Sequence, residues 1–174
     1  MNTCSWQIEE TNLKQNKMTT ETMTVFRKLF ESGFHNDFDT MADTIAEDCE
    51  WILMPDMNKV YKGKKEVVQL CTQGKLASDK TPEILFDKAT AEWGVFEYVN
   101  RGVITKEAVE FSKTTGWQFP TDASTLVGQK YAVGVSFIYQ INAEGKIAHL
   151  REYLDMASLM KQFTPADKLV ANVS

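Results

Sequence analysis

The segment from Lys146 to Asp155 places one carboxylate among apolar neighbours. Alternate side chains of an extended strand share a face, so Ala148, Leu150, Glu152 and Leu154 are expected on one side. Glu152 is then the lone acid on an apolar surface, and burial there raises the pKa of a carboxyl group. Such a group can hold or transfer a proton near neutral pH, as general acid or base catalysis requires. At an exposed strand end the same residue would have no such role.

A second strand, Gly94 to Val103, offers polar groups that could work with this acid. Phe96, Tyr98 and Asn100 share one of its faces. In this interpretation Tyr98 donates to a developing oxyanion, Asn100 orients substrate or water, and Glu152 carries the proton. In the alternative interpretation, Tyr98 and Asn100 only satisfy buried hydrogen bonds beside the sheet.

Strand register decides which of these side chains enter the interior. A shift by one residue on the middle strand would bring Arg101 inward instead of its neighbours. If Glu152 points inward, His149, Arg151 and Tyr153 point to the opposite face of the sheet. The opposite register would offer His149 as a base.

The remaining pattern predicts the elements that position these residues. Met23, Phe26 and Phe30 recur at helical spacing, and Asn36 or Asp37 can cap the helix that follows. The expected helices are Thr20 to Gly33, the segment from this cap to Ile45, Lys64 to Gly74, and Thr105 to Gly116. The expected strands are Cys49 to Pro55, Glu83 to Ala91, Gly94 to Val103, Gln129 to Ile141 and Lys146 to Leu154, with the last two joined by a turn at Asn142 to Gly145.

Helices followed by adjacent strands predict an α+β domain, in which helices cover one face of an antiparallel sheet and strong curvature leaves a cone-shaped cavity. We expect one domain at 18–163, with a flexible arm at 1–17 and a tail at 164–174. The helical insertion at 105–117, with Trp117 and Phe119 after the helix, is a lid or a packing extension.

Composition excludes several classes of function. The net charge is -5 and the pI is about 5.1, which argues against a nucleic-acid partner. No apolar run is long enough to span a membrane. The three cysteines form no pairable set, so a reduced, cytoplasmic setting is expected. His35 and His149 lack metal-ligand spacing, and no phosphate or dinucleotide motif occurs, so neither a metal nor a cofactor is predicted.

The order of elements, together with Glu144 to Ile147 and Arg151 to Asp155, resembles the SnoaL-like branch of the nuclear transport factor 2-like superfamily, and limonene-1,2-epoxide hydrolases look closest. The likeness runs from Met23 to Phe163 and includes Met54-Pro55 and the Tyr-Lys-Gly segment ending at Gly63. It implies a cone-shaped α+β barrel, whose curved mixed, mostly antiparallel sheet is covered by N-terminal helices and encloses a pocket. It also implies a homodimer formed through the outer face of the sheet.

The resemblance also bears on individual residues. Glu152 falls where the epoxide hydrolases have an acid on the last strand. Their Arg-x-Asp pair falls on Tyr98 and Asn100, and their water-holding residues fall on Trp51 and Leu53. The ketosteroid isomerases have a catalytic aspartate before a proline. In this chain Met54 stands at the corresponding position.

We therefore predict a cofactor-independent enzyme that uses acid/base chemistry on a bulky apolar oxygenated molecule, such as a terpenoid, steroid-like or polyketide compound. Epoxide hydrolysis, isomerisation and cyclisation all remain open. The predicted catalytic residues are Glu152, Tyr98 and Asn100, and the predicted substrate-binding residues are Trp51, Leu53, Phe96 and Leu150. The alternative function is a noncatalytic ligand-binding or protein-interaction domain of the same fold.

Overall fold

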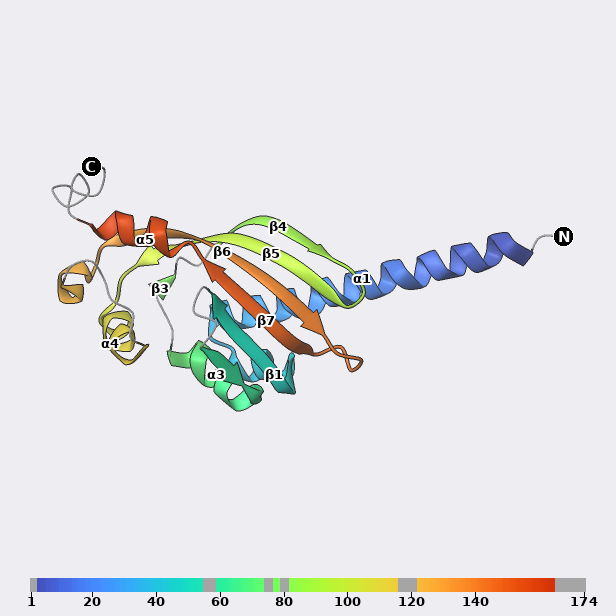
Figure 1. Cartoon of the computed structure of the whole chain (residues 1–174), viewed down its shortest axis with the longest axis horizontal. Coiled ribbons are helices and arrows are strands. Elements are labelled where there is room, and N and C mark those ends of the chain that lie inside the picture. The colour runs from blue at the N-terminus through green and yellow to red at the C-terminus, as the bar shows by residue number, and fades with distance from the viewer. Residues whose placement is uncertain (1–2, 55–58, 74–76, 79–81, 116–121, 165–174) are drawn as a thin grey trace.

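The computed structural model describes residues 3–54, 59–73, 77–78, 82–115 and 122–164 of the chain (Figure 1). Its helices are α1 (Thr3–His35), α2 (Phe38–Asp43), α3 (Gly63–Gln73), α4 (Lys106–Thr115) and α5 (Met156–Phe163), with a short 3-10 helix at Ala123–Leu126. Its strands are β1 (Ile45–Met54), β2 (Val60–Lys62), β3 (Ala77–Ser78), β4 (Glu83–Ala89), β5 (Trp93–Val103), β6 (Lys130–Ile141) and β7 (Ile147–Leu154). The predicted α+β architecture is confirmed.

The described strands form one mixed sheet in the order β2-β1-β7-β6-β5-β3, with β4 also paired to β5. β1 runs parallel to β7, and the other neighbouring strands are antiparallel. The long strands β5, β6 and β7 curve together, and α1 runs along the sheet (Figure 1). The predicted cone of a curved, mostly antiparallel sheet is therefore confirmed.

Aromatic side chains pack α1 against the inner face of the sheet. Phe26 is fully buried and stacks on Tyr139 of β6, with ring centroids 4.1 Å apart. One turn further along, the Phe30 ring lies 4.7 Å from both Phe96 and Tyr98 of β5. This is the helical stripe that the spacing of Phe26 and Phe30 predicted. Packing on these rings fixes the face of β5 that points inward.

The largest differences from the predicted boundaries are at the starts of α1 and β1. α1 begins at Thr3 instead of Thr20, so the helix includes most of the segment 1–17 predicted as an arm, and its first half extends beyond the sheet (Figure 1). Gln, Glu, Lys and Leu in this segment are good helix formers, and a helix anchored by packing extends at little further cost. Ile45 begins β1 instead of ending the second helix, because it pairs with Ile147 of β7.

Side-chain hydrogen bonds cap the helices α2 and α4 and stabilise the turn between β6 and β7, as predicted. Asp37 caps α2 by accepting a hydrogen bond from the Thr40 N–H at 3.1 Å. Thr105 caps α4 through the Ala108 N–H, also at 3.1 Å. In the turn between β6 and β7, the Asn142 side chain accepts two backbone hydrogen bonds, and Gly145 has a φ of 71°. The end of the predicted 105–117 insertion, with Trp117 and Phe119, lies outside the described residues.

The outer face of the sheet carries exposed apolar side chains, with Phe86 on β4 and Ile138 on β6 among them. His149 and Arg151 of β7 also lie exposed on this side. The homodimer expected through this face stays a prediction. Within the described residues, no helix combines the length and apolar character of a membrane span.

Gly94 on β5 gives a test of how tightly the inner face is packed. A Cβ atom at this position would lie 2.5 Å from Tyr139 Cζ and 2.9 Å from the Lys88 carbonyl oxygen. We expect Gly94→Ala to lower the free energy of unfolding by about 1–3 kcal/mol, since the Tyr139 ring must leave its stacked position on Phe26. Urea denaturation measures this change.

Gly134 on the neighbouring strand β6 is the matched control. A Cβ atom there meets nothing within 4 Å. Gly134→Ala should leave the free energy of unfolding unchanged or slightly increase it. Equal losses in the two variants would show that strand propensity, and not contact with Tyr139, sets the effect.

Candidate functional site

Glu152 points to the inner face of the sheet, as the alternation along β7 predicted. It pairs across the sheet with Leu53 of β1 and with Phe137 of β6. The Trp51 indole N–H donates a hydrogen bond to Glu152 Oε2 at 3.1 Å. The Trp51 ring itself packs edge-on against Phe137, with centroids 6.0 Å apart. The acid is therefore held by one neutral donor in an aromatic setting.

The surroundings of Glu152 keep its proton bound up to neutral pH. Burial raises the pKa of the carboxyl group from 4.5 to about 7, and the hydrogen bond from Trp51 opposes part of this rise. Glu152 as a whole residue is partly exposed, while its carboxyl group is desolvated. A carboxyl group with this pKa can accept or donate a proton near pH 7.

Three weak acids lie close enough to Glu152 to respond to its charge. Burial raises the pKa values of Tyr61, Cys71 and Tyr98, and the negative charge of Glu152 raises each of them further. All three side chains therefore stay protonated at neutral pH and can only donate hydrogens to an anion. They bring no positive charge to the site.

Tyr61 and Cys71 were not among the predicted site residues. Tyr61 lies on β2, which pairs antiparallel with β1 opposite Trp51. Cys71 lies on α3, and both side chains pack partly buried against the core. The apolar stripe of α3, which includes Cys71, was visible in the sequence, but its proximity to β7 depends on long-range packing.

The inner face of β5 carries the residues predicted to work with Glu152. Phe96 and Tyr98 are buried. Asn100 is partly buried, and its enclosed Oδ1 atom has no hydrogen-bond partner within the described part of the chain. Arg101 is exposed and forms an ion pair with Glu83 at 2.8 Å, so the shifted register that would place it inside is not adopted.

The alternative base, His149, lies on the opposite face of β7 from Glu152. It is exposed, and its Nδ1 atom is 3.7 Å from Glu50 Oε2. The register that would turn His149 inward is therefore not adopted.

The residues predicted to bind substrate lie on the same inner surface. Trp51 is buried and Leu53 partly buried on β1, while Phe96 and Leu150 are at most 1% exposed. Phe96 and Leu150 are thus part of the core, and a ligand could reach them only through movement of their neighbours. Contact of any of these residues with substrate stays a prediction.

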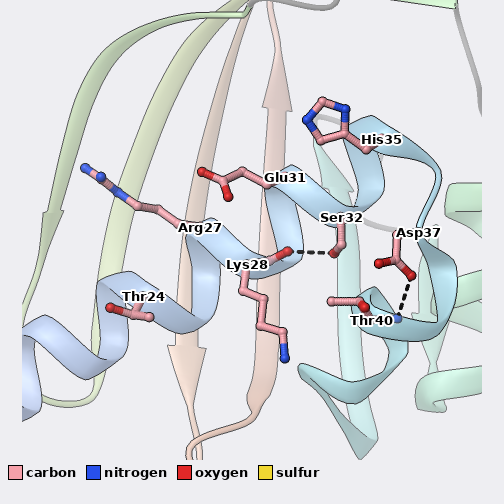
Figure 2. A pocket seen from close by; sticks show the side chains of 8 residues that line it. All are labelled: Thr24, Arg27, Lys28, Glu31, Ser32, His35, Asp37 and Thr40. Atoms are coloured by element: carbon pink, nitrogen blue, oxygen red, sulfur yellow. Dashed lines mark hydrogen bonds between the residues drawn. The ribbon is translucent and has the colours of Figure 1, made fainter.

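A surface groove of about 530 Å³ lies away from Glu152, on the outer side of α1 and α2 (Figure 2). It is lined by Thr24, Arg27, Lys28, Glu31, Ser32, His35, Asp37 and Thr40. Several of its polar groups have structural partners: Arg27 binds Asp87, Ser32 donates to the Lys28 carbonyl oxygen, and Asp37 caps α2. These contacts give Arg27, Ser32 and Asp37 structural roles that involve no catalysis.

A second groove, of about 330 Å³, lies beside β4 to β7 and is lined by Leu85, Glu97, Tyr98, Gly134, Val135, Ser136, Tyr153, Leu154 and Asp155. There the Ser136 hydroxyl donates to Glu97 at 3.2 Å. Within the described residues, no group of three or more His, Cys, Asp or Glu side chains is arranged to hold a metal ion. Of the described Asp and Glu residues, only Glu152 combines a raised pKa with an aromatic interior.

No protein-family model and no curated protein sequence matches this chain. Solved structures do match its fold. An LEH-like epoxide hydrolase of M. tuberculosis is 17% identical, with a TM-score of 0.60 over 89% of this chain and 96% of that one. A candidate SnoaL-like polyketide cyclase of Jannaschia sp. CCS1 is 12% identical, with a TM-score of 0.65 over 84% and 94%.

A candidate ketosteroid isomerase of Kribbella flavida is also 12% identical, with a TM-score of 0.57 over 78% of each chain. At these identities the likeness shows the fold and not the activity. The chain therefore has the cone-shaped fold of nuclear transport factor 2-like proteins, in agreement with the resemblance seen in its sequence.

Replacing Trp51 tests what its hydrogen bond does to Glu152. Trp51→Phe removes the N–H donor and keeps an aromatic ring against Phe137. Since this hydrogen bond lowers the pKa of Glu152, the variant should have a pKa above the starting value of about 7, by about one unit. Carbon-13 NMR titration of the glutamate carboxyl groups measures the change. An unchanged pKa would show that the indole N–H does not stabilise the carboxylate.

The raised pKa of Glu152 also makes stability depend on pH. Because the folded state binds this proton more tightly, its stabilising effect is complete below about pH 4.5 and is lost as pH rises through about 7. The loss is at most on the order of 3 kcal/mol. In Glu152→Gln this part of the dependence should disappear, so the variant gains stability over the wild type above pH 7.

Urea denaturation between pH 5 and pH 8 measures this difference. Glu144→Gln is the control, because Glu144 is exposed in the turn between β6 and β7 and should keep the wild-type pH dependence. A wild-type slope in Glu152→Gln would mean that Glu152 ionises as freely in the folded chain as in the unfolded one.

Proposed function

We propose that this protein is a cofactor-independent enzyme in which Glu152 transfers a proton on a bulky apolar molecule that carries oxygen. The observation that supports this most is a desolvated carboxyl group with a pKa of about 7, which accepts a hydrogen bond from the neutral Trp51 N–H and belongs to a residue that is partly exposed. Near pH 7 such a group is present in both protonation states. It can therefore take a proton in one step and return it in the next.

The absence of a charged partner favours some reactions over others. Epoxide opening by water needs a proton donor for the leaving oxygen and a base for the water at the same time. Among the described residues, no second carboxylate or cation contributes to the pKa of Glu152. Asp87, another acid on the inner face, is tied to Arg27 at 2.5 Å. Isomerisation or cyclisation by one carboxyl group therefore ranks above hydrolysis.

In the proposed reaction, the Glu152 carboxylate removes a proton from a carbon next to a carbonyl group. The C–H electrons form a carbon–carbon double bond, and the carbonyl oxygen becomes an enolate oxygen. The protonated Glu152 then returns the proton to another carbon, which completes an isomerisation, or to an oxygen formed during ring closure. No oxidant or cofactor is consumed, and the carboxylate is regenerated.

The same surroundings supply donors and an apolar wall for this chemistry. Tyr98 keeps its proton because burial raises its pKa well above the usual value, so its hydroxyl can donate to an enolate oxygen. The Trp51 N–H remains on Oε2 and leaves Oε1 as the atom that exchanges the proton. Aromatic walls with few polar groups favour a bulky apolar ligand. The hydrolase, cyclase and isomerase names of the matched structures support small-molecule chemistry on this fold.

The proposal is tested by turnover of a panel of terpenoid, steroid and polyketide ketones and epoxides. Glu152→Gln should reduce kcat/KM at least about a hundredfold, because the amide cannot accept and return the proton. If the carboxylate starts the reaction, kcat/KM should rise with pH through about 7. Glu144→Gln should keep the wild-type rate.

The alternative, a noncatalytic binding domain, gives a different outcome. It predicts ligand-induced thermal stabilisation without turnover, and an affinity that Glu152→Gln leaves nearly unchanged. That result would contradict the proposed enzyme activity and show that the protein is a noncatalytic binding domain.

A further inference from the structure

Asn100 is a polar residue on the inner face that has no role in the proposed proton transfer. Its Oδ1 atom is buried and has no hydrogen-bond partner among the residues that the structure describes. The residue opposite it on β6, Val133, is buried and has no side-chain donor. A buried acceptor without a protein partner costs free energy unless water or a ligand donates to it. The interior therefore contains a hydrogen-bond acceptor, Asn100 Oδ1, that a ligand could use.

The position of Asn100 separates it from the reacting group. Phe96 of β5 is in line with Glu152 across the sheet through Phe137 of β6. Asn100 lies further along β5 on the same face, with Tyr98 between. A ligand that reaches both Glu152 and Asn100 must therefore extend past the Tyr98 side chain.

Two other buried polar atoms without partners, Asp87 Oδ1 and Tyr139 Oη, do not lead to the same conclusion. The negative charge of Asp87 adds to the rise in the Tyr139 pKa that burial causes, so these two groups lie close together. Arg27 binds the other oxygen of Asp87, and Phe26 stacks on the Tyr139 ring. They belong to the packed contact between α1 and the sheet.

We propose that the ligand of this site carries a hydroxyl group remote from its reacting centre, and that this hydroxyl donates a hydrogen bond to Asn100 Oδ1. The inference rests on the proposed function only in placing the reacting part of the ligand beside Glu152. It narrows the substrate class to elongated apolar molecules with an oxygen function at one end and a hydroxyl group at the other. A ligand with a ketone in place of this hydroxyl group would bring its carbonyl oxygen against Asn100 Oδ1. Neither atom can donate a hydrogen, so such a ligand should bind poorly.

Three steroid probes test this proposal: a 3-hydroxy-17-ketosteroid, its 3-keto counterpart and its 3-deoxy counterpart. Isothermal titration calorimetry should give a Kd for the hydroxyl probe about tenfold lower than for the keto probe, with the deoxy probe between them. In Asn100→Leu the three Kd values should come within about twofold of one another. Asn100→Asp keeps an acceptor and should keep the preference for the hydroxyl probe. A keto probe that binds as tightly as the hydroxyl probe, or a preference that survives in Asn100→Leu, would overturn the proposal.

Thermal unfolding without ligand gives an independent measurement and decides the case in which no probe binds. Replacing an unpaired buried acceptor by an apolar group of similar size should raise the Tm of Asn100→Leu by about 2–4 °C. A fall in Tm of this size would show that Asn100 has a structural partner, and the proposal would fail.

The binding measurements also separate this proposal from the proposed function. They require no turnover and can be repeated in Glu152→Gln, where the preference for the hydroxyl probe should persist. A preference for the hydroxyl probe without turnover would contradict the proposed enzyme activity and support the hydroxyl site. Turnover without this preference would contradict the hydroxyl site and support the proposed enzyme activity.

Discussion

The arrangement of this interior depends on one constraint: a carboxyl group is kept among aromatic side chains, and from the described residues it receives a single hydrogen bond, donated by the neutral Trp51 N–H. An ionised carboxylate loses much of its hydration there, and one N–H group replaces only part of it. The Glu152 carboxyl group therefore holds its proton to a higher pH than an exposed carboxyl group does. The Trp51 ring can hold its N–H in place because it packs on Phe137. Donor and acid are thus positioned by the same aromatic contacts.

Those contacts depend in turn on the long helix across the sheet. Phe26 and Phe30 of α1 occupy the concave face between β5 and β6, so Phe96 and Tyr98 must face the helix. Gly94 allows the Tyr139 ring to lie close to the backbone of β5, where a larger residue would displace it. The reactive end of the interior, at β1 and β7, is therefore supported by packing at β5 and β6. A change in that packing would reach Glu152 through Phe137.

Much of this could be read from local patterns in the sequence. Alternation along Lys146 to Asp155 was enough to turn Glu152 inward, and Thr105 and Asp37 signalled the starts of their helices. The fold class followed from the order of helices and strands. What failed depended on context: the first half of α1 has helical composition without an apolar stripe, and Ile45 is drawn into a strand by pairing with β7. Tyr61 and Cys71 could not be predicted beside Glu152, because only long-range packing brings β2 and α3 to that strand.

The neutrality of the surroundings bears directly on the kind of chemistry that Glu152 can perform. A nearby cation would hold the group as a carboxylate, which favours a fixed base, and a second carboxylate would divide the roles of acid and base between two residues. Here the flanking weak acids Tyr61, Cys71 and Tyr98 stay protonated, and burial together with the Trp51 hydrogen bond sets the pKa of Glu152. One residue must then act as base and acid in turn. That requirement suits reactions in which the proton removed is the proton returned, so the electrostatics favour rearrangement of a substrate over its hydrolysis.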